Sequence, residues 1–218
     1  MVAFSRPRRL ILVDALLGTL DVMSDSFQML VDADVTVAGA RDTSRAVLAE
    51  FRKRGMITGK ANGDCVLGGK GYQPGPSIPG LYASRKNEIR FWELQTCGVE
   101  VKVGRGFNVE ALGQACEGLA CPCCGSHILP FDDDFDSAMS VAVREWLDRS
   151  GRALVRCPQC SKKSAVTKWQ CTPPLGFGNL SFRFWNWPPF DVPAWKIEIP
   201  DLVQKLTGHT IVVTEGHV

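Results

Sequence analysis

Two short cysteine motifs constrain this chain more than any other feature of its sequence. The segments Cys-Pro-Cys-Cys-Gly at 121–125 and Cys-Pro-Gln-Cys-Ser at 157–161 each place two cysteines around a proline, with a small residue directly after the second cysteine. Two intervening residues form a tight turn that brings both sulfurs toward one ion, proline presets φ in that turn, and glycine tolerates the positive φ that follows. Four thiolates are the ligand set of a closed, tetrahedral zinc site. The sequence therefore predicts one structural zinc ion held by Cys121, Cys124, Cys157 and Cys160.

Two neighbouring side chains compete for a place in this site. Cys123 is adjacent to Cys124, and His127 follows three positions later. Cys124 is preferred because a glycine follows it directly, while Cys123 and His127 remain alternative ligands. A second metal site is a further alternative, built from Cys116, Cys123, His127 and Cys171. Cysteines outside a metal site most often behave as small buried apolar residues. We expect this behaviour of Cys65, Cys97, Cys116 and Cys171.

The paired motifs resemble the knuckles of zinc ribbons. Residues 153–168 match the second hairpin of a ribbon, with a strand, a knuckle and a strand in succession. The resemblance covers about a quarter of the chain and implies a structural element, not an activity. It departs from the common gap of roughly 15–20 residues, because 32 residues separate Cys124 from Cys157. An apolar stripe at helical spacing predicts a helix over 137–150, which accounts for the excess as an insertion.

The remaining sequence predicts an α+β fold with a mostly antiparallel sheet. β-branched and alternating segments predict strands at 28–39, 88–95, 98–104, 180–187, 195–199 and 210–214. We expect an antiparallel pair turning near Cys97 and Gly98, and helices near 109–117 and 201–206. The predicted organisation is an extension or mis-called start at 1–22, an N-terminal α+β part at 23–115, a zinc-ribbon-like module at 116–172, and a C-terminal part at 173–218 that packs with 23–115.

The composition is that of an ordinary folded protein. Of 218 residues, 45% are hydrophobic and 22% charged, which is enough for a sizeable core and one or two domains. Arg6, Arg8 and Arg9 precede an apolar run at 10–20, loosely like a twin-arginine leader. Asp14 interrupts this run, it is too short to span a bilayer, and no small-residue cleavage site follows. We therefore expect a cytoplasmic protein without a membrane partner.

The charge distribution keeps a nucleic-acid partner open. The net charge is only +2, yet residues 151–190 contain six arginines and lysines and no acidic residue. Basic residues interleaved with aromatic ones are typical of single-strand binding surfaces. Four thiolates on Zn²⁺ would leave a formal charge of −2, however, so the basic residues beside the second knuckle also have a local electrostatic role.

Known catalytic motifs do not match the chain. Residues 63–70 look like a phosphate-binding loop, but Gly71 stands where a serine or threonine should bind magnesium. The acidic run 132–136 lacks the glycine and glutamate of a calcium loop. Asp32 and Asp34 are more simply explained as polar strand residues than as a metal site. His209 and His217 have no plausible nucleophile nearby in the sequence.

An aromatic segment from Trp169 to Trp195 suggests where a partner binds. Prolines stiffen the turn after Trp187, and tryptophans often dominate interface energies. Trp185, Trp187 and Trp195 are therefore candidate partner-binding residues, with packing into the core as the alternative. The sequence favours a non-enzymatic zinc-stabilised binding or adaptor protein, most simply with another protein as partner. A nucleic-acid-binding zinc-ribbon protein is the first alternative, and an enzyme of unrecognised type is the second.

Overall fold

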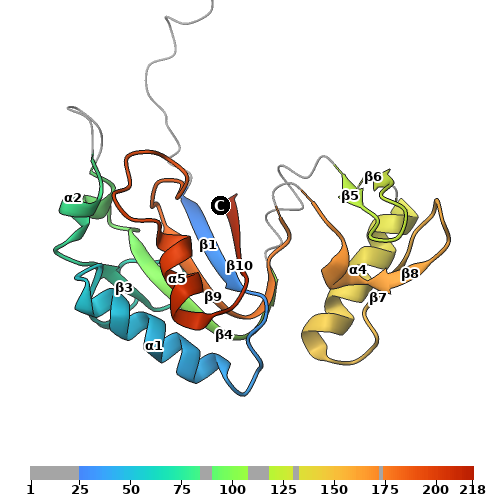
Figure 1. Cartoon of the computed structure of the whole chain (residues 1–218), viewed down its shortest axis with the longest axis horizontal. Helices are drawn as coiled ribbons and strands as arrows, with labels where there is room; N and C mark the ends of the chain where they lie inside the picture. The colour runs from blue at the N-terminus through green and yellow to red at the C-terminus, as the bar shows by residue number, and fades with distance from the viewer. Residues whose placement is uncertain (1–24, 84–89, 108–117, 130–132, 172–173) are drawn as a thin grey trace, which may run out of the picture.

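A six-stranded antiparallel sheet forms the larger part of the molecule (Figure 1). The computed structural model describes residues 25–83, 90–107, 118–129, 133–171 and 174–218. The strand order is β10-β1-β9-β4-β3-β2. The strands are β1 (Ser26–Asp32), β2 (Ile57–Asn62), β3 (Gly71–Pro74), β4 (Gly98–Phe107), β9 (Phe177–Trp185) and β10 (Ile211–His217). The predicted α+β class with antiparallel pairing is confirmed.

Helices α1 (Ala40–Lys53) and α5 (Ile199–Thr207) cover one face of this sheet (Figure 1). In α1, Val47, Leu48 and Phe51 are buried at helical spacing. The Phe51 ring lies 6.1 Å from two phenylalanine rings of β9, edge to face. Two short helical turns, α2 (Ile78–Leu81) and η1 (Phe91–Glu93), add to the same apolar cluster. This face of the sheet therefore holds the main hydrophobic core.

Strand β9 is buried on both faces. Its Leu180, Phe182 and Phe184 join the core beneath the helices. Trp185 points to the opposite face, where its ring lies 5.3 Å from that of Phe27. A strand in the middle of a sheet with both faces covered is apolar without alternation, which explains the aromatic density of this segment.

Burial corrects the expectation that three tryptophans bind a partner. Trp185, Trp187 and Trp195 are only 2%, 2% and 6% exposed. Strand β9 ends before Asn186, whose positive φ of 55° reverses the alternation of the strand. Trp187 then stacks on Trp195 within the main core, with ring centroids 5.7 Å apart. An interface anchor must be reachable from solvent, so these indoles act as core residues.

Several predicted strands also differ in the structure. Residues 91–93 form a 3₁₀ turn instead of a strand, so no hairpin turns at Cys97 and Gly98. Strand β4 pairs instead with β3 and β9. Strand β1 ends at Asp32, and the predicted strand 195–199 reduces to a single bridge of Trp195 with Tyr82 before α5 begins at Ile199. The predicted helix 109–117 and the predicted extension 1–22 lie outside the described residues.

A smaller module lies between β4 and β9 in the chain (Figure 1). Its elements are β5 (Leu119–Ala120), β6 (His127–Ile128), α4 (Asp133–Asp148), β7 (Leu154–Arg156), β8 (Lys163–Ala165) and the 3₁₀ turn η2 (Val166–Lys168). The predicted helix between the two cysteine motifs is therefore present as α4. None of the helices in the described ranges is long and apolar enough to cross a membrane.

Aromatic packing joins the module to the sheet. Phe107 and Phe177, at the paired ends of β4 and β9, are stacked with centroids 4.6 Å apart. Trp146 of α4 packs edge-on against Phe177 at 5.1 Å. A bulge in β4, with Gly104 at a φ of 116°, precedes Arg105, whose guanidinium lies 5.0 Å from the Trp146 ring centroid. Such bulges re-aim side chains at the end of a ladder.

The core role of the tryptophans yields a first prediction. We expect Trp187→Ala to lower the free energy of unfolding by about 3–5 kcal/mol, because a buried indole leaves a cavity. Trp92→Ala, at a half-buried indole beside Phe91, is the matched control and should cost distinctly less. Urea denaturation of both variants measures the difference. Equal losses in the two variants would contradict the burial argument.

Candidate metal centre

Each cysteine motif forms the turn of a short β-hairpin. The first lies between β5 and β6, where Cys121 N–H donates to the Ser126 carbonyl. The second lies between β7 and β8, where Cys157 N–H donates to the Lys162 carbonyl in the same way. Ala120 also forms a bridge with Gln170, which ties the first hairpin to the chain beyond the second. Two equivalent hairpin turns therefore present their cysteines to each other.

The four sulfur atoms lie close together. Sγ atoms of Cys121, Cys124, Cys157 and Cys160 are all within 4.8 Å of one another. Two of these distances are 3.9 Å for Cys121 to Cys160 and 3.8 Å for Cys124 to Cys157. A tetrahedron with metal–sulfur bonds of about 2.3 Å has edges of about 3.8 Å. The arrangement thus fits a four-coordinate metal ion.

The backbone of both turns is built for this geometry. Gly125 and Ser161, each directly after the second cysteine, have φ values of 72° and 59°. Gly125 N–H donates to the Cys121 carbonyl and Ser161 N–H to the Cys157 carbonyl, both at 2.9 Å. The Cys123 N–H points at the Cys121 sulfur at 3.3 Å. A backbone N–H directed at sulfur stabilises the thiolate form.

Electrostatics within the cluster call for a cation. Hydrogen bonds from the Ser126 hydroxyl and N–H lower the pKa of Cys124 to about 6. The pKa of Cys160 rises to about 12 although the Lys162 N–H lowers it, because burial and the neighbouring sulfurs oppose its ionisation. Four thiolates in contact repel one another unless a positive ion lies between them. A bound metal ion would remove that conflict.

The module has an apolar core of its own beside the sulfurs. Its buried residues include Leu119, Met139, Val155, Val166 and Trp169. Cys121 and Cys157 are buried against this cluster, whereas Cys124 is exposed. One side of the sulfur cluster therefore packs against protein, and the other is accessible to a chelator.

The alternative ligands lie outside this set. Cys123 and His127 are exposed, and neither belongs to the group of close donor atoms. In the described ranges, no second group of metal-binding side chains was found. The proposed second site also needs Cys116, which lies outside the described residues. Which cysteines bind the ion stays a prediction, with the geometry in favour of Cys124.

The other cysteines have different environments. Cys65 and Cys97 are buried free thiols, as expected. Burial raises the pKa of Cys65 and raises that of Cys97 to about 12, so both stay protonated and unreactive at neutral pH. Cys171 differs from the expectation, since it is half-buried and disulfide-bonded.

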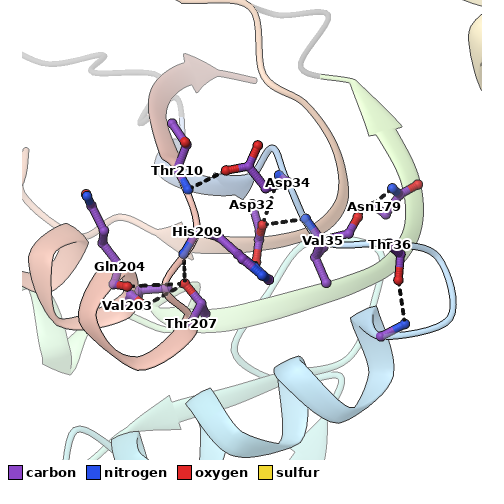
Figure 2. Close-up of polar contacts among 11 residues, drawn as sticks. Asp32, Asp34, Val35, Thr36, Asn179, Val203, Gln204, Thr207, His209 and Thr210 are labelled. Carbon is purple, nitrogen blue, oxygen red and sulfur yellow. Dashed lines mark hydrogen bonds and ion pairs between the residues drawn. The ribbon is translucent and has the colours of Figure 1, made fainter.

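A polar cluster at the end of β1 was not expected from the sequence (Figure 2). Buried Asp32 lies 2.8 Å from Nδ1 of His209, and its other oxygen accepts the Val35 N–H at 2.9 Å. Asp34 accepts the Thr210 N–H at 2.7 Å, which lowers the pKa of that carboxyl. These bonds tie the loop after β1 to the loop before β10. The two aspartates therefore hold turns together, as polar strand-end residues do.

The Asp32–His209 pair has half of the geometry of a hydrolase site. A carboxylate that orients a histidine is one part of a catalytic triad, and a nucleophile is the other. Within the described ranges, the His209 ring makes only the bond to Asp32. No sequence motif indicates this pair, because Asp32 and His209 lie near opposite ends of the chain.

Metal removal is the direct test of the centre. We expect about one equivalent of zinc in the purified protein, and we expect Cys157→Ser to lose it. Metal binding contributes on the order of 10–16 kcal/mol to folding in small zinc modules, so the variant should lose the structure of both hairpins. Elemental analysis and proton NMR of the module measure the two effects.

The matched control is Cys123→Ser, which alters an exposed cysteine in the same turn. It should keep both the metal and the fold. Cys65→Ala, far along the chain, should also keep the metal. Zinc loss in Cys123→Ser would contradict the ligand assignment, and less than half an equivalent in the unaltered protein would contradict the zinc prediction.

Comparison with known proteins adds no relative from which a role can be transferred. No family model, curated protein or solved structure matches the chain. The functional interpretation of the chain therefore depends on the geometry of its own residues.

Proposed function

We propose that the protein is a non-enzymatic binding or adaptor protein whose zinc-ribbon-like module is folded by a structural zinc ion. The observation that carries this proposal is the set of four close sulfurs at residues 121, 124, 157 and 160. With all four positions filled by protein, the ion has no open position for water or substrate. A catalytic zinc ion requires such a position, so this centre is suited to holding two hairpins together.

We assign the partner-binding surface to the zinc-ribbon-like module. The two most exposed large apolar side chains in the described ranges are Leu129 after β6 and Val141 on α4, at 62% and 57%. Leu154 on β7 is also exposed. Exposed apolar residues are common singly, but the two highest exposures both belong to this small module. The partner that fits such a surface is another protein.

The enzyme hypothesis receives less support. Its best candidate is the Asp32–His209 pair, and that pair has no nucleophile bonded to it in the described ranges. The Asp32 carboxylate is also used to hold the loop after β1. A structural role accounts for these contacts of the pair.

We also place the protein in the cytoplasm. Seven cysteines are free thiols in the described part of the chain, which suits a reducing compartment. The disulfide at Cys171 stands against this assignment. The thiol content of protein isolated without reductant decides between a reducing and an oxidising compartment.

Affinity capture tests the adaptor proposal. We expect the tagged protein to retain a defined partner from lysate, and a Leu129→Ser, Val141→Ser double variant to lose that same partner because apolar contact area is removed. Val37→Ser, Leu206→Ser is the matched control, at exposed apolar positions outside the module. Quantitative mass spectrometry compares the three. Retention by both double variants would place the binding surface elsewhere.

Nucleic-acid binding is a second candidate, favoured by one observation on the β7–β8 hairpin. Arg156 and Lys163 are direct cross-strand neighbours, and both are exposed. Like charges in this position repel each other. None of the five ion pairs in the described ranges involves either residue. The thiolate charge of the zinc centre offsets part of this potential, which is why the proposal ranks second.

The salt dependence of binding tests this candidate. For single-stranded nucleic acid, each phosphate contact contributes about 0.7 to the slope of log K against log salt. An Arg156→Gln, Lys163→Gln double variant should therefore lower the slope by about 1.4. Fluorescence anisotropy with a labelled oligonucleotide gives the value. Arg45→Gln, Lys53→Gln on α1 is the control and should leave the slope unchanged; absence of a steep slope in the unaltered protein would eliminate this candidate.

A further inference from the structure

A small cavity lies on the sheet face opposite α1 and α5. It has a volume of about 140 Å³ and is lined by residues of β1, β4 and β9 together with Gly176. Its charged and polar lining consists of Glu100, Lys102, Ser181 and Arg183. This cavity is separate from the metal centre, and its lining belongs to the three central strands of the sheet.

Arg183 is the central residue of this cavity. It lies on β9, directly between Met29 of β1 and Glu100 of β4 in the strand register. Its guanidinium carbon lies 4.3 Å from the ring centroid of Phe27 and 5.3 Å from that of Trp185. Stacking on aromatic faces restrains the plane of the guanidinium and leaves its N–H groups free for hydrogen bonds.

The charge of Arg183 has no ion pair within the described ranges. The five ion pairs found there all lie elsewhere, and the Arg183 side chain donates no hydrogen bond to another described residue. Its cross-strand neighbour Glu100 is engaged differently, since one carboxylate oxygen accepts the Trp185 indole N–H at 3.2 Å. A half-buried guanidinium without an acceptor keeps its hydrogen-bond donors available to a ligand.

A second cation lies at the cavity. Lys102 is exposed at its tip, and its aliphatic chain lies against Gly106, where an added Cβ would be 3.7 Å from Nζ. Lys102 and Ser181 are also cross-strand neighbours on this face. Two cations therefore face one carboxylate, which leaves a net positive charge that matches a monoanion.

The floor of the cavity is apolar. Met29 and Val31 are buried beside Arg183 and Ser181. A cavity of about 150 Å³ can hold a benzene molecule, so this one has room for a few carbon atoms next to a charged group. Inorganic phosphate would leave the apolar floor without contact and would bring a second negative charge toward Glu100.

We propose that this cavity binds a small organic carboxylate, whose carboxylate group pairs with the Arg183 guanidinium and whose carbon chain contacts Met29 and Val31. The planar fork of arginine matches both oxygens of a carboxylate. Lys102 adds charge at the mouth, and the Ser181 hydroxyl is available as a donor. The site adds a ligand-binding role that does not depend on the zinc-ribbon-like module.

Calorimetric titration of the full zinc-loaded chain tests the proposal, with butyrate as the probe. Butanol, which has the same carbon chain without the charge, and inorganic phosphate are the comparison ligands. We expect butyrate to bind, butanol to bind at least tenfold more weakly, and phosphate to bind more weakly than butyrate. No detectable butyrate binding, or tighter binding of phosphate, would overturn the proposal.

Variants identify the residue responsible. We expect Arg183→Gln to weaken butyrate binding at least tenfold and Arg183→Lys to weaken it less, because lysine keeps the charge but not the fork. Arg156→Gln, an exposed arginine in the zinc-ribbon-like module, is the matched control and should bind as the unaltered protein does. Unchanged binding in Arg183→Gln would refute the assignment.

Loss of stacking on Phe27 could unfold the Arg183 variants, so a surface variant provides an independent readout. Lys102 is exposed, and Lys102→Gln should leave the melting temperature unchanged while weakening butyrate binding severalfold. Equal butyrate affinity in Lys102→Gln and the unaltered protein would show that the cavity mouth carries no part of the binding, against the proposal.

Discussion

The antiparallel ladder between β4 and β9 is the constraint on which the rest of the structure depends. It runs from Gly98 opposite Trp185 to Phe107 opposite Phe177. Because these strands are neighbours in space, the whole chain between them must leave the sheet and return at one point. That excursion contains both cysteine motifs. The stacked rings of Phe107 and Phe177 lie where the chain leaves the sheet and returns to it, and Trp146 packs against Phe177.

The same ladder explains why the aromatic segment lies in the core. As a central strand, β9 has hydrogen-bonding neighbours on both sides and covered faces above and below. Every apolar side chain on β9 is therefore removed from water. This includes Trp185, which points to the sheet face opposite the helices. A polar exception on such a strand is costly, which makes Arg183 the most informative residue on β9.

Two places in the described part of the chain gather charge that no ion pair there compensates, and they have opposite sign. The four sulfurs of the module attract a cation, because ionising one thiol raises the pKa of another. The proposed anion pairs with Arg183, because its cross-strand neighbour Glu100 already accepts an indole N–H. In both cases the proposed ligand follows from the same physical rule, that a charged group attracts a partner of opposite charge. By contrast, the Asp32 carboxylate already contacts the His209 ring and the Val35 N–H, so it implies no ligand.

Local chemistry was enough to predict the turns at the two cysteine motifs, because a Cys-Pro-x-Cys segment and the positive φ at Gly125 depend only on neighbouring residues. Helix α4 and the α+β class were predictable for the same reason. The partners of β4, the burial of Trp187 and the pairing of Asp32 with His209 were decided only by the tertiary structure. Each of these depends on residues that are distant in sequence, such as Leu30 opposite Phe182. Periodicity shows that a strand has an apolar face, but the neighbours that cover this face come from elsewhere in the chain.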